Sequence, residues 1–176
     1  MKRREFVTTL GLALVAPRAW AAPAPAPTLA EIWKSDSCGC CGEWIKHLQK
    51  NGFATKVHSV HDAAPVRRAL GIPDKLGSCH TAKVGGYAIE GHVPASDIRR
   101  LLSEKPKAIG LTAPAMPQGS PGMDVPNSPP YEVLLVREDK STILFARHVP
   151  EKGAARKDSV SCAATPDPKA TGCGKT

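Results

Sequence analysis

The stretch of this sequence most suited to chemistry is Ser37-Cys38-Gly39-Cys40-Cys41-Gly42, which holds three thiols within four residues. Cys38 and Cys41 have the C-x-x-C spacing of a dithiol that opens and closes a disulfide. Cys40 is one thiol more than such a pair needs, and it would invite wrong pairings. A soft ion such as Cu(I), in contrast, gains from every additional thiolate. The stretch therefore predicts a copper and redox site, with Cys38 and Cys41 as the reacting pair.

The residues around these cysteines predict a strand followed by a helix. Residues 31–34 form a short apolar run that ends at the polar residues 35–37. Apolar residues then recur at helical spacing from Trp44 to Leu48, and Gly52 follows as a helix terminator. The cysteines therefore lie at a helix N-terminus, where unpaired N–H groups favour the thiolate and make each sulfur a better nucleophile and ligand.

Two other uses of these cysteines compete with copper. Exported proteins commonly carry structural disulfides, but three close cysteines cannot all pair with one another. A structural zinc ion would take a set of three cysteines completed by His80. Closely spaced triple cysteines suit bridged Cu(I) better than one tetrahedral ion, so copper remains the expected metal.

The first 21 residues have the composition of an export signal. Basic residues at positions 2–4 precede an apolar run over residues 6–16, and Ala19-Trp20-Ala21 provides a small-x-small cleavage site. The Arg3-Arg4 pair resembles part of a twin-arginine signal, and the general secretory route is the alternative. We therefore expect the mature protein in the periplasm.

The rest of the chain divides into three parts. They are a linker of proline and alanine over residues 22–28, one domain over residues 29–150, and a polar tail over residues 151–176 that we expect to be disordered. Loss of residues 1–21 lowers the formal charge from +8 to +5. The remaining basic residues are scattered without aromatic neighbours, which argues against nucleic-acid binding. No later segment has the roughly 18 apolar residues that span a bilayer, so we expect no transmembrane segment in the mature chain.

The order of elements in the domain indicates an α/β fold of the thioredoxin-like type. A strand over residues 54–60 and a short helix over residues 65–70 follow the first helix. A hairpin then turns at Gly85-Gly86, and a helix over residues 94–103 closes the unit. We expect a single domain with a mixed sheet and flexible termini.

Cys79 stands at the entrance of this hairpin. In a thioredoxin-like arrangement the loop that enters the hairpin lies against the redox helix. Cys79 would then lie beside the turn from Cys38 to Cys41 and supply a fourth soft ligand. His80 and His92 flank the same hairpin, and each is either a metal ligand or an exposed turn residue.

Four motifs together resemble the CopG-type family of periplasmic copper-resistance proteins, whose label is often only a domain of unknown function. They lie in order at residues 38–42, 78–81, 90–94 and 114–123. The resemblance implies a thioredoxin-like fold in which cysteines of the first motif and Cys79 hold copper, with a role in copper oxidoreduction. It covers about residues 30–148.

A long loop over residues 113–127, rich in proline and glycine, carries Met116 and Met123. Thioethers are soft ligands that need no deprotonation and therefore suit Cu(I). The alternative is that a methionine fills a gap in the core. After the loop, residues 131–136 and 142–146 predict an added C-terminal β-hairpin.

Cys162 and Cys173 lie in the polar tail, where burial cannot explain them. They form a disulfide with each other, or they belong to a mobile arm that captures copper.

These observations lead to one hypothesis and three alternatives. We expect a periplasmic copper-resistance protein that cycles copper between Cu(I) and Cu(II) and exchanges it with other periplasmic copper-handling proteins. The alternatives are a copper chaperone, a storage module without turnover, and a protein thiol-disulfide oxidoreductase. The expected ligands, in a site that can hold several copper ions, are Cys38, Cys40, Cys41 and Cys79, with Met116, Met123, His80 and His92 as further candidates.

Overall fold

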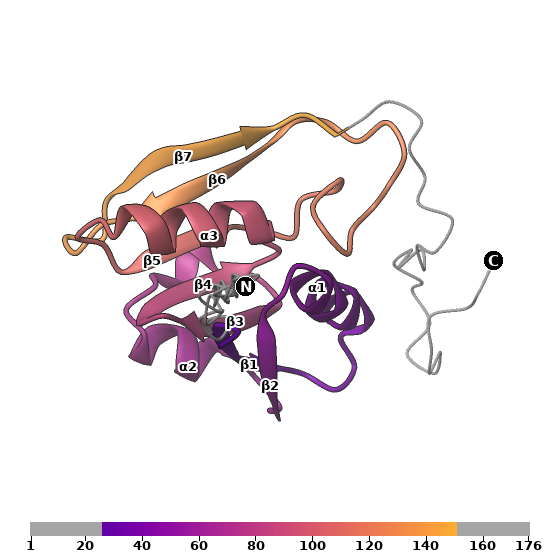
Figure 1. Cartoon of the computed structure of the whole chain (residues 1–176), viewed down its shortest axis with the longest axis horizontal. Coiled ribbons are helices and arrows are strands. Elements are labelled where there is room, and N and C mark those ends of the chain that lie inside the picture. The colour runs from indigo at the N-terminus through magenta and orange to yellow at the C-terminus, as the bar shows by residue number, and fades with distance from the viewer. Residues whose placement is uncertain (1–25, 151–176) are drawn as a thin grey trace, which may run out of the picture.

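One mixed sheet of seven strands, in the order β2-β1-β3-β4-β5-β6-β7, runs through residues 26–150, which the computed structural model describes (Figure 1). Neighbouring strands are parallel in the pairs β1–β2 and β4–β5 and antiparallel elsewhere. The strands span β1 Leu29–Lys34, β2 Ala54–Ser59, β3 His80–Val84, β4 Tyr87–Gly91, β5 Gly110–Ala113, β6 Tyr131–Val136 and β7 Thr142–His148.

Three α-helices and one short 3₁₀ helix connect the strands in this part of the chain. They span α1 Gly39–Lys50, α2 Ala64–Ala69, η1 Asp74–Leu76 and α3 Ala95–Glu104. The first four strands, with α1 between β1 and β2 and α3 after β4, have the arrangement predicted for a thioredoxin-like domain. The predicted mixed sheet and the C-terminal hairpin β6–β7 are confirmed.

The sheet has an apolar cluster on each face, because successive strand residues point to opposite sides. On β6, Val133 and Leu135 pack with the larger cluster, whereas Leu134 and Val136 pack with the smaller one. The larger cluster joins α1 and α3 to the sheet, and Trp44 of α1 is fully buried in it. Burying a large apolar side chain stabilises a fold by about 1.5–3 kcal/mol. The packing of α1 on the sheet therefore also fixes the position of the cysteines at the N-terminal end of this helix.

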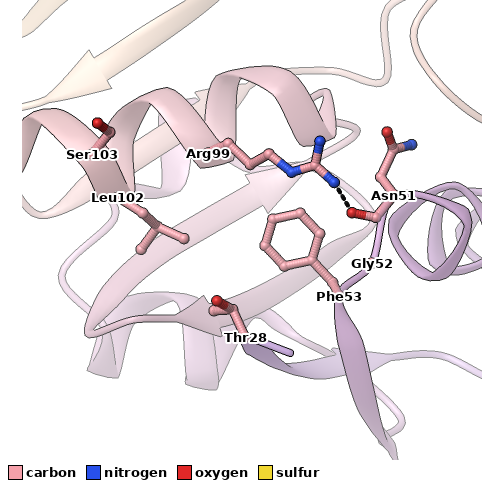
Figure 2. Close-up of a pocket in the computed structure, with 7 residues that line it drawn as sticks. All are labelled: Thr28, Asn51, Gly52, Phe53, Arg99, Leu102 and Ser103. Carbon is pink, nitrogen blue, oxygen red and sulfur yellow. Dashed lines mark hydrogen bonds between the residues drawn. The ribbon is translucent and has the colours of Figure 1, made fainter. Parts of the chain in front are cut away.

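Helix α3 is also attached to the end of α1. The Arg99 guanidinium lies 5.7 Å from the centroid of the Phe53 ring and donates a hydrogen bond to the backbone oxygen of Asn51. These residues line a small pocket that also includes Thr28, Gly52, Leu102 and Ser103 (Figure 2). None of the cysteines or histidines expected to bind metal lines this pocket, so it is separate from the expected site.

The strand β5 was not predicted from the sequence. It has only four residues, all buried, and so it shows neither the length nor the polar alternation by which a strand is recognised. It lies between β4 and β6 and joins the hairpin β6–β7 to the thioredoxin-like part.

The predictions for residues 1–21 and 151–176, including Cys162 and Cys173, lie outside the described residues. Of the predicted linker, residues 26–28 are described, and they are exposed. Within residues 26–150, no helix combines the length and apolar character needed to cross a membrane.

The contact of β4 with β5 leaves no room for a side chain at Gly110, since an added Cβ would lie 1.7 Å from the Ala88 backbone oxygen. We expect Gly110→Ala to lower the free energy of unfolding by about 3 kcal/mol. Gly42→Ala is the matched control, because its Cβ would meet nothing within 4 Å, and alanine favours a helix by about 0.5–1 kcal/mol. Urea unfolding of both variants measures the difference. Equal stabilities would contradict the described pairing of β4 with β5.

Candidate metal centre

The N-terminal turn of α1 presents three of the predicted ligands. Cys38 is the N-cap residue, and its N–H donates to the Ser35 backbone oxygen at 3.1 Å. No side chain caps the helix, and no acidic residue lies in its first turn. The positive end of the helix therefore acts on the sulfurs themselves and favours their ionised form. Cys38 and Cys41 form a disulfide, whereas Cys40 is a free, buried cysteine.

Cys79 connects this turn to the histidines. Its sulfur lies 3.4 Å from Cys41 Sγ, 3.5 Å from His80 Nδ1 and 3.4 Å from His92 Nε2. The loop that enters the β3–β4 hairpin therefore lies against the N-terminal turn of α1, as the predicted order of elements requires. Both His80 and His92 are fully buried, which excludes the alternative that they are exposed turn residues.

Six side chains form two overlapping groups of possible metal ligands. Within each group, one ligand atom per residue lies within 4.8 Å of every other. The groups share Cys41 and Cys79, so ions bound in both would be neighbours. One group is Cys38, Cys40, Cys41 and Cys79, and the other is Cys41, Cys79, His80 and His92. Four sulfurs and two imidazoles form a donor set that suits copper.

The tautomer of His92 follows from its surroundings. Its Nδ1 lies 2.8 Å from the backbone oxygen of Pro121, which can only accept a hydrogen bond, so Nδ1 carries the hydrogen. In the neutral ring Nε2 then has a free lone pair directed at Cys79 Sγ. A backbone carbonyl on the far nitrogen is a common way to orient a metal-binding histidine.

His80 is held in the neutral form by its environment. Complete burial, together with the nearby His92, lowers the pKa of His80 well below its usual range. Its ring packs against Trp44, with centroids 4.3 Å apart. Among the described residues, its Nε2 is one of two buried side-chain nitrogens without a hydrogen-bond partner. A neutral imidazole with an unused nitrogen is able to bind a metal.

The pKa values of the two free thiols, Cys40 and Cys79, are shifted in opposite directions. Interaction with Cys79 lowers the pKa of Cys40 well below its usual range. The same interaction with Cys40, together with burial, raises the pKa of Cys79. Cys40 is therefore the more acidic of the two free thiols, and its thiolate form suits a soft cation.

The long loop between β5 and β6 comes down beside α1 (Figure 1). Gly122 packs so tightly there that an added Cβ would lie 2.8 Å from the Trp44 backbone nitrogen and 2.9 Å from the Cys40 backbone oxygen. This loop carries both predicted methionine ligands. Met116 is 39% exposed and Met123 is half-buried. Their binding of copper stays a prediction.

The sequence patterns predict no role for Glu90 or for Pro121. Glu90 is fully buried beside the cluster, and the signal for it was a lone carboxylate in an apolar strand. The role of Pro121 rests on its backbone oxygen, for which the sequence carries no signal.

Comparison with known proteins identifies relatives of this chain. A family model described as "Protein of unknown function, DUF411" matches residues 76–123. Two solved structures, named "Copper resistance protein copG", Form 2 and Form 1, are each 38% identical to the chain. The Form 2 match covers 70% of this chain and 99% of that chain with a TM-score of 0.66, and the Form 1 match covers 69% and 98% with the same score. No curated protein matches the chain.

A substitution at Gly122 tests whether the loop orients His92. Besides the close contacts of its Cβ, alanine would have to adopt a φ of +87°. We expect Gly122→Ala to lift the loop from α1, so that His92 loses the Pro121 oxygen and populates both tautomers. Nitrogen chemical shifts of the His92 ring, recorded by NMR in the metal-free protein, report the tautomer. A single unchanged tautomer in Gly122→Ala, with Gly42→Ala as control, would show that the loop does not orient this ring.

Proposed function

This chain belongs to the family of the copper resistance protein CopG, and from that membership and the geometry of its metal centre we propose that it binds copper and cycles the metal between Cu(I) and Cu(II). The expected ligands are the six cysteines and histidines of the two overlapping groups. Met116 and Met123 are candidates for additional ligands from the loop.

One observation carries this proposal: the disulfide lies inside the set of metal ligands. Cys38 and Cys41 form the disulfide and also belong to the sulfur-rich group. Closing the disulfide removes two thiolates, whereas opening it restores them. Because thiolates favour Cu(I) and imidazoles also accept Cu(II), the reduced protein favours Cu(I) more strongly than the oxidised one does. The state of the disulfide is thereby coupled to the preferred valence of the bound metal.

The exchange of electrons balances within the site. Two Cu(I) ions each give up one electron and become Cu(II). The Cys38–Cys41 disulfide takes the two electrons and two protons and becomes two thiols. The reverse reaction reduces two Cu(II) ions and closes the disulfide again. Two overlapping ligand groups support the binding of more than one copper ion, which this stoichiometry needs.

A copper chaperone or storage module is the second candidate, and partial exposure of two cysteines favours it. Cys38 and Cys79 are half-buried, so a partner protein could reach copper bound to them. A protein thiol-disulfide oxidoreductase would use the same Cys38–Cys41 pair, but it would have no need for Cys40 or for two buried histidines.

The proposed location is the periplasm. The composition of residues 1–21, which lie outside the described part of the chain, supports export. Other copper-handling proteins of that compartment are then the expected partners.

Redox cycling distinguishes the proposed enzyme from the chaperone. We expect the anaerobic, fully reduced protein to bind more than one Cu(I) per chain and to hold it far more tightly than Zn(II), because its donors are soft. A mild acceptor should then generate Cu(II) with the metal still bound. A competing Cu(I) chelator measures affinity, and optical and paramagnetic-resonance spectra follow the valence over repeated cycles.

Two results would contradict this expectation. Release of copper upon oxidation, or its transfer only as Cu(I) to a partner protein, favours the chaperone. Tight binding of one zinc ion with negligible copper would remove copper from the proposal altogether.

Cys40→Ser tests the residue that a dithiol enzyme does not need. Loss of a residue that hydrogen-bonds to a metal ligand typically lowers metal affinity by about 10–100-fold. Cys40 is itself an expected ligand, so we expect Cys40→Ser to lower copper affinity by more than this. The Cys38–Cys41 disulfide should still form, because neither of its sulfurs changes. Chelator competition and thiol titration measure the two properties. Glu31→Gln, on β1 and outside both ligand groups, is the control that should retain copper, and unchanged copper binding in Cys40→Ser would favour the thiol-disulfide oxidoreductase.

A further inference from the structure

Glu90 is a fully buried carboxylate on β4 whose two oxygens both accept hydrogen bonds. Its Oε1 accepts the Ser78 N–H at 2.7 Å, and its Oε2 accepts the Thr81 hydroxyl at 2.6 Å. Arg67 of α2 is its ionic partner, with Nη1 at 3.4 Å from Oε1. Burying a carboxylate is costly unless it is paired in this way, so Glu90 needs a structural or functional reason to be there.

These contacts bracket Cys79 along the chain. Ser78 precedes Cys79, and Thr81 lies two residues after it. The carboxylate therefore ties together both sides of the short segment that presents the Cys79 sulfur to Cys41. The bond to Ser78 is made by a backbone N–H, so it fixes the main chain directly before the cysteine, whatever the side chain of Ser78 does.

Other contacts hold the residues that precede Ser78. The Leu76 backbone oxygen accepts the Thr112 hydroxyl at 2.9 Å. Gly77 lies on the Arg67 guanidinium, since an added Cβ would meet Arg67 Cζ at 2.7 Å. Arg67 is held in turn by Asp74, at 3.0 Å. Among the described hydrogen bonds, only those of Glu90 act on both sides of Cys79.

We propose that Glu90 is a positioning residue, which holds the Cys79 sulfur in contact with Cys41 and thereby completes both ligand groups. Glu90 belongs to neither ligand group, and it acts through the main chain at Ser78 and the side chain at Thr81. The consequence for copper rests on the proposed function, whereas the positioning of Cys79 against Cys41 does not.

Three substitutions separate positioning from charge and from general stability. Glu90→Ala removes the bridge. Glu90→Gln removes the charge but keeps the length of the side chain. The glutamine oxygen can accept the Ser78 N–H, and its amide group can donate to the Thr81 oxygen. Thr81→Val breaks one half of the bridge and leaves the ion pair with Arg67 intact. The matched control is Glu31→Gln, a carboxylate on β1 whose partners are Lys56 and His58.

The first measurement needs no metal. In the full chain with Cys38, Cys40, Cys162 and Cys173 changed to serine, only Cys41 and Cys79 remain to form a disulfide. Glutathione buffers then measure the effective concentration of one thiol at the other. We expect Glu90→Ala to lower it by about tenfold or more and Thr81→Val to lower it by less. Glu90→Gln should stay close to the parent protein, and Glu31→Gln should equal it.

The second measurement is Cu(I) affinity by chelator competition in the chain that retains all its cysteines. Glu90→Ala should weaken binding by about 10–100-fold, while Glu90→Gln restores most of the affinity. Thermal unfolding of each variant identifies proteins that do not fold. If Glu90→Ala does not fold, Thr81→Val and Glu90→Gln are compared with the parent protein in both measurements instead.

The outcomes separate this inference from the proposed function. An unchanged Cys41–Cys79 equilibrium in both Glu90→Ala and Thr81→Val would overturn the inference, even where copper binds tightly. Equal losses in Glu90→Gln and Glu90→Ala would overturn it in favour of a role of the charge. A shifted equilibrium in a protein that binds no copper would support the inference and remove the proposed function.

Discussion

The contact between the Cys41 and Cys79 sulfurs, 3.4 Å apart, is the interaction on which the rest of the site depends. It joins the N-terminal turn of α1 to the segment that enters the β3–β4 hairpin. Because Cys41 and Cys79 belong to both ligand groups, separating them would leave two incomplete sets. The packing of α1 and α3 on the sheet, the loop at Gly122 and the bridge at Glu90 all hold this contact from different sides.

The site places several polar groups where water is excluded, and each such group is costly unless it is paired. His92 is paired with Pro121, and Glu90 is paired with Ser78 and Thr81. His80 differs, because its Nε2 has no hydrogen-bond partner. A buried nitrogen left without a partner agrees with a site that gains a bond when it binds a ligand.

The same geometry relates the candidate functions to one another. A chaperone, a store and a copper oxidoreductase would all use these ligands, and they differ in what the Cys38–Cys41 disulfide does while metal is bound. In this arrangement two of the sulfurs cannot be disulfide-bonded and act as thiolate ligands at the same time. That constraint couples electron transfer to metal preference, and it is the reason for placing the oxidoreductase first.

The sequence by itself determined the periodic elements, the thioredoxin-like order and the grouping of Cys38, Cys40 and Cys41, because these follow from local spacing along one helix and from the order of strands. It also predicted the approach of Cys79. It missed β5, whose four buried residues carry no pattern, and it gave no role to Glu90. Only the tertiary structure decided which ring nitrogen of His92 faces the sulfur and that both histidines are buried. Those properties depend on groups that are distant from the histidines in the sequence, such as the Pro121 oxygen. The spacing of residues along the sequence does not predict such contacts.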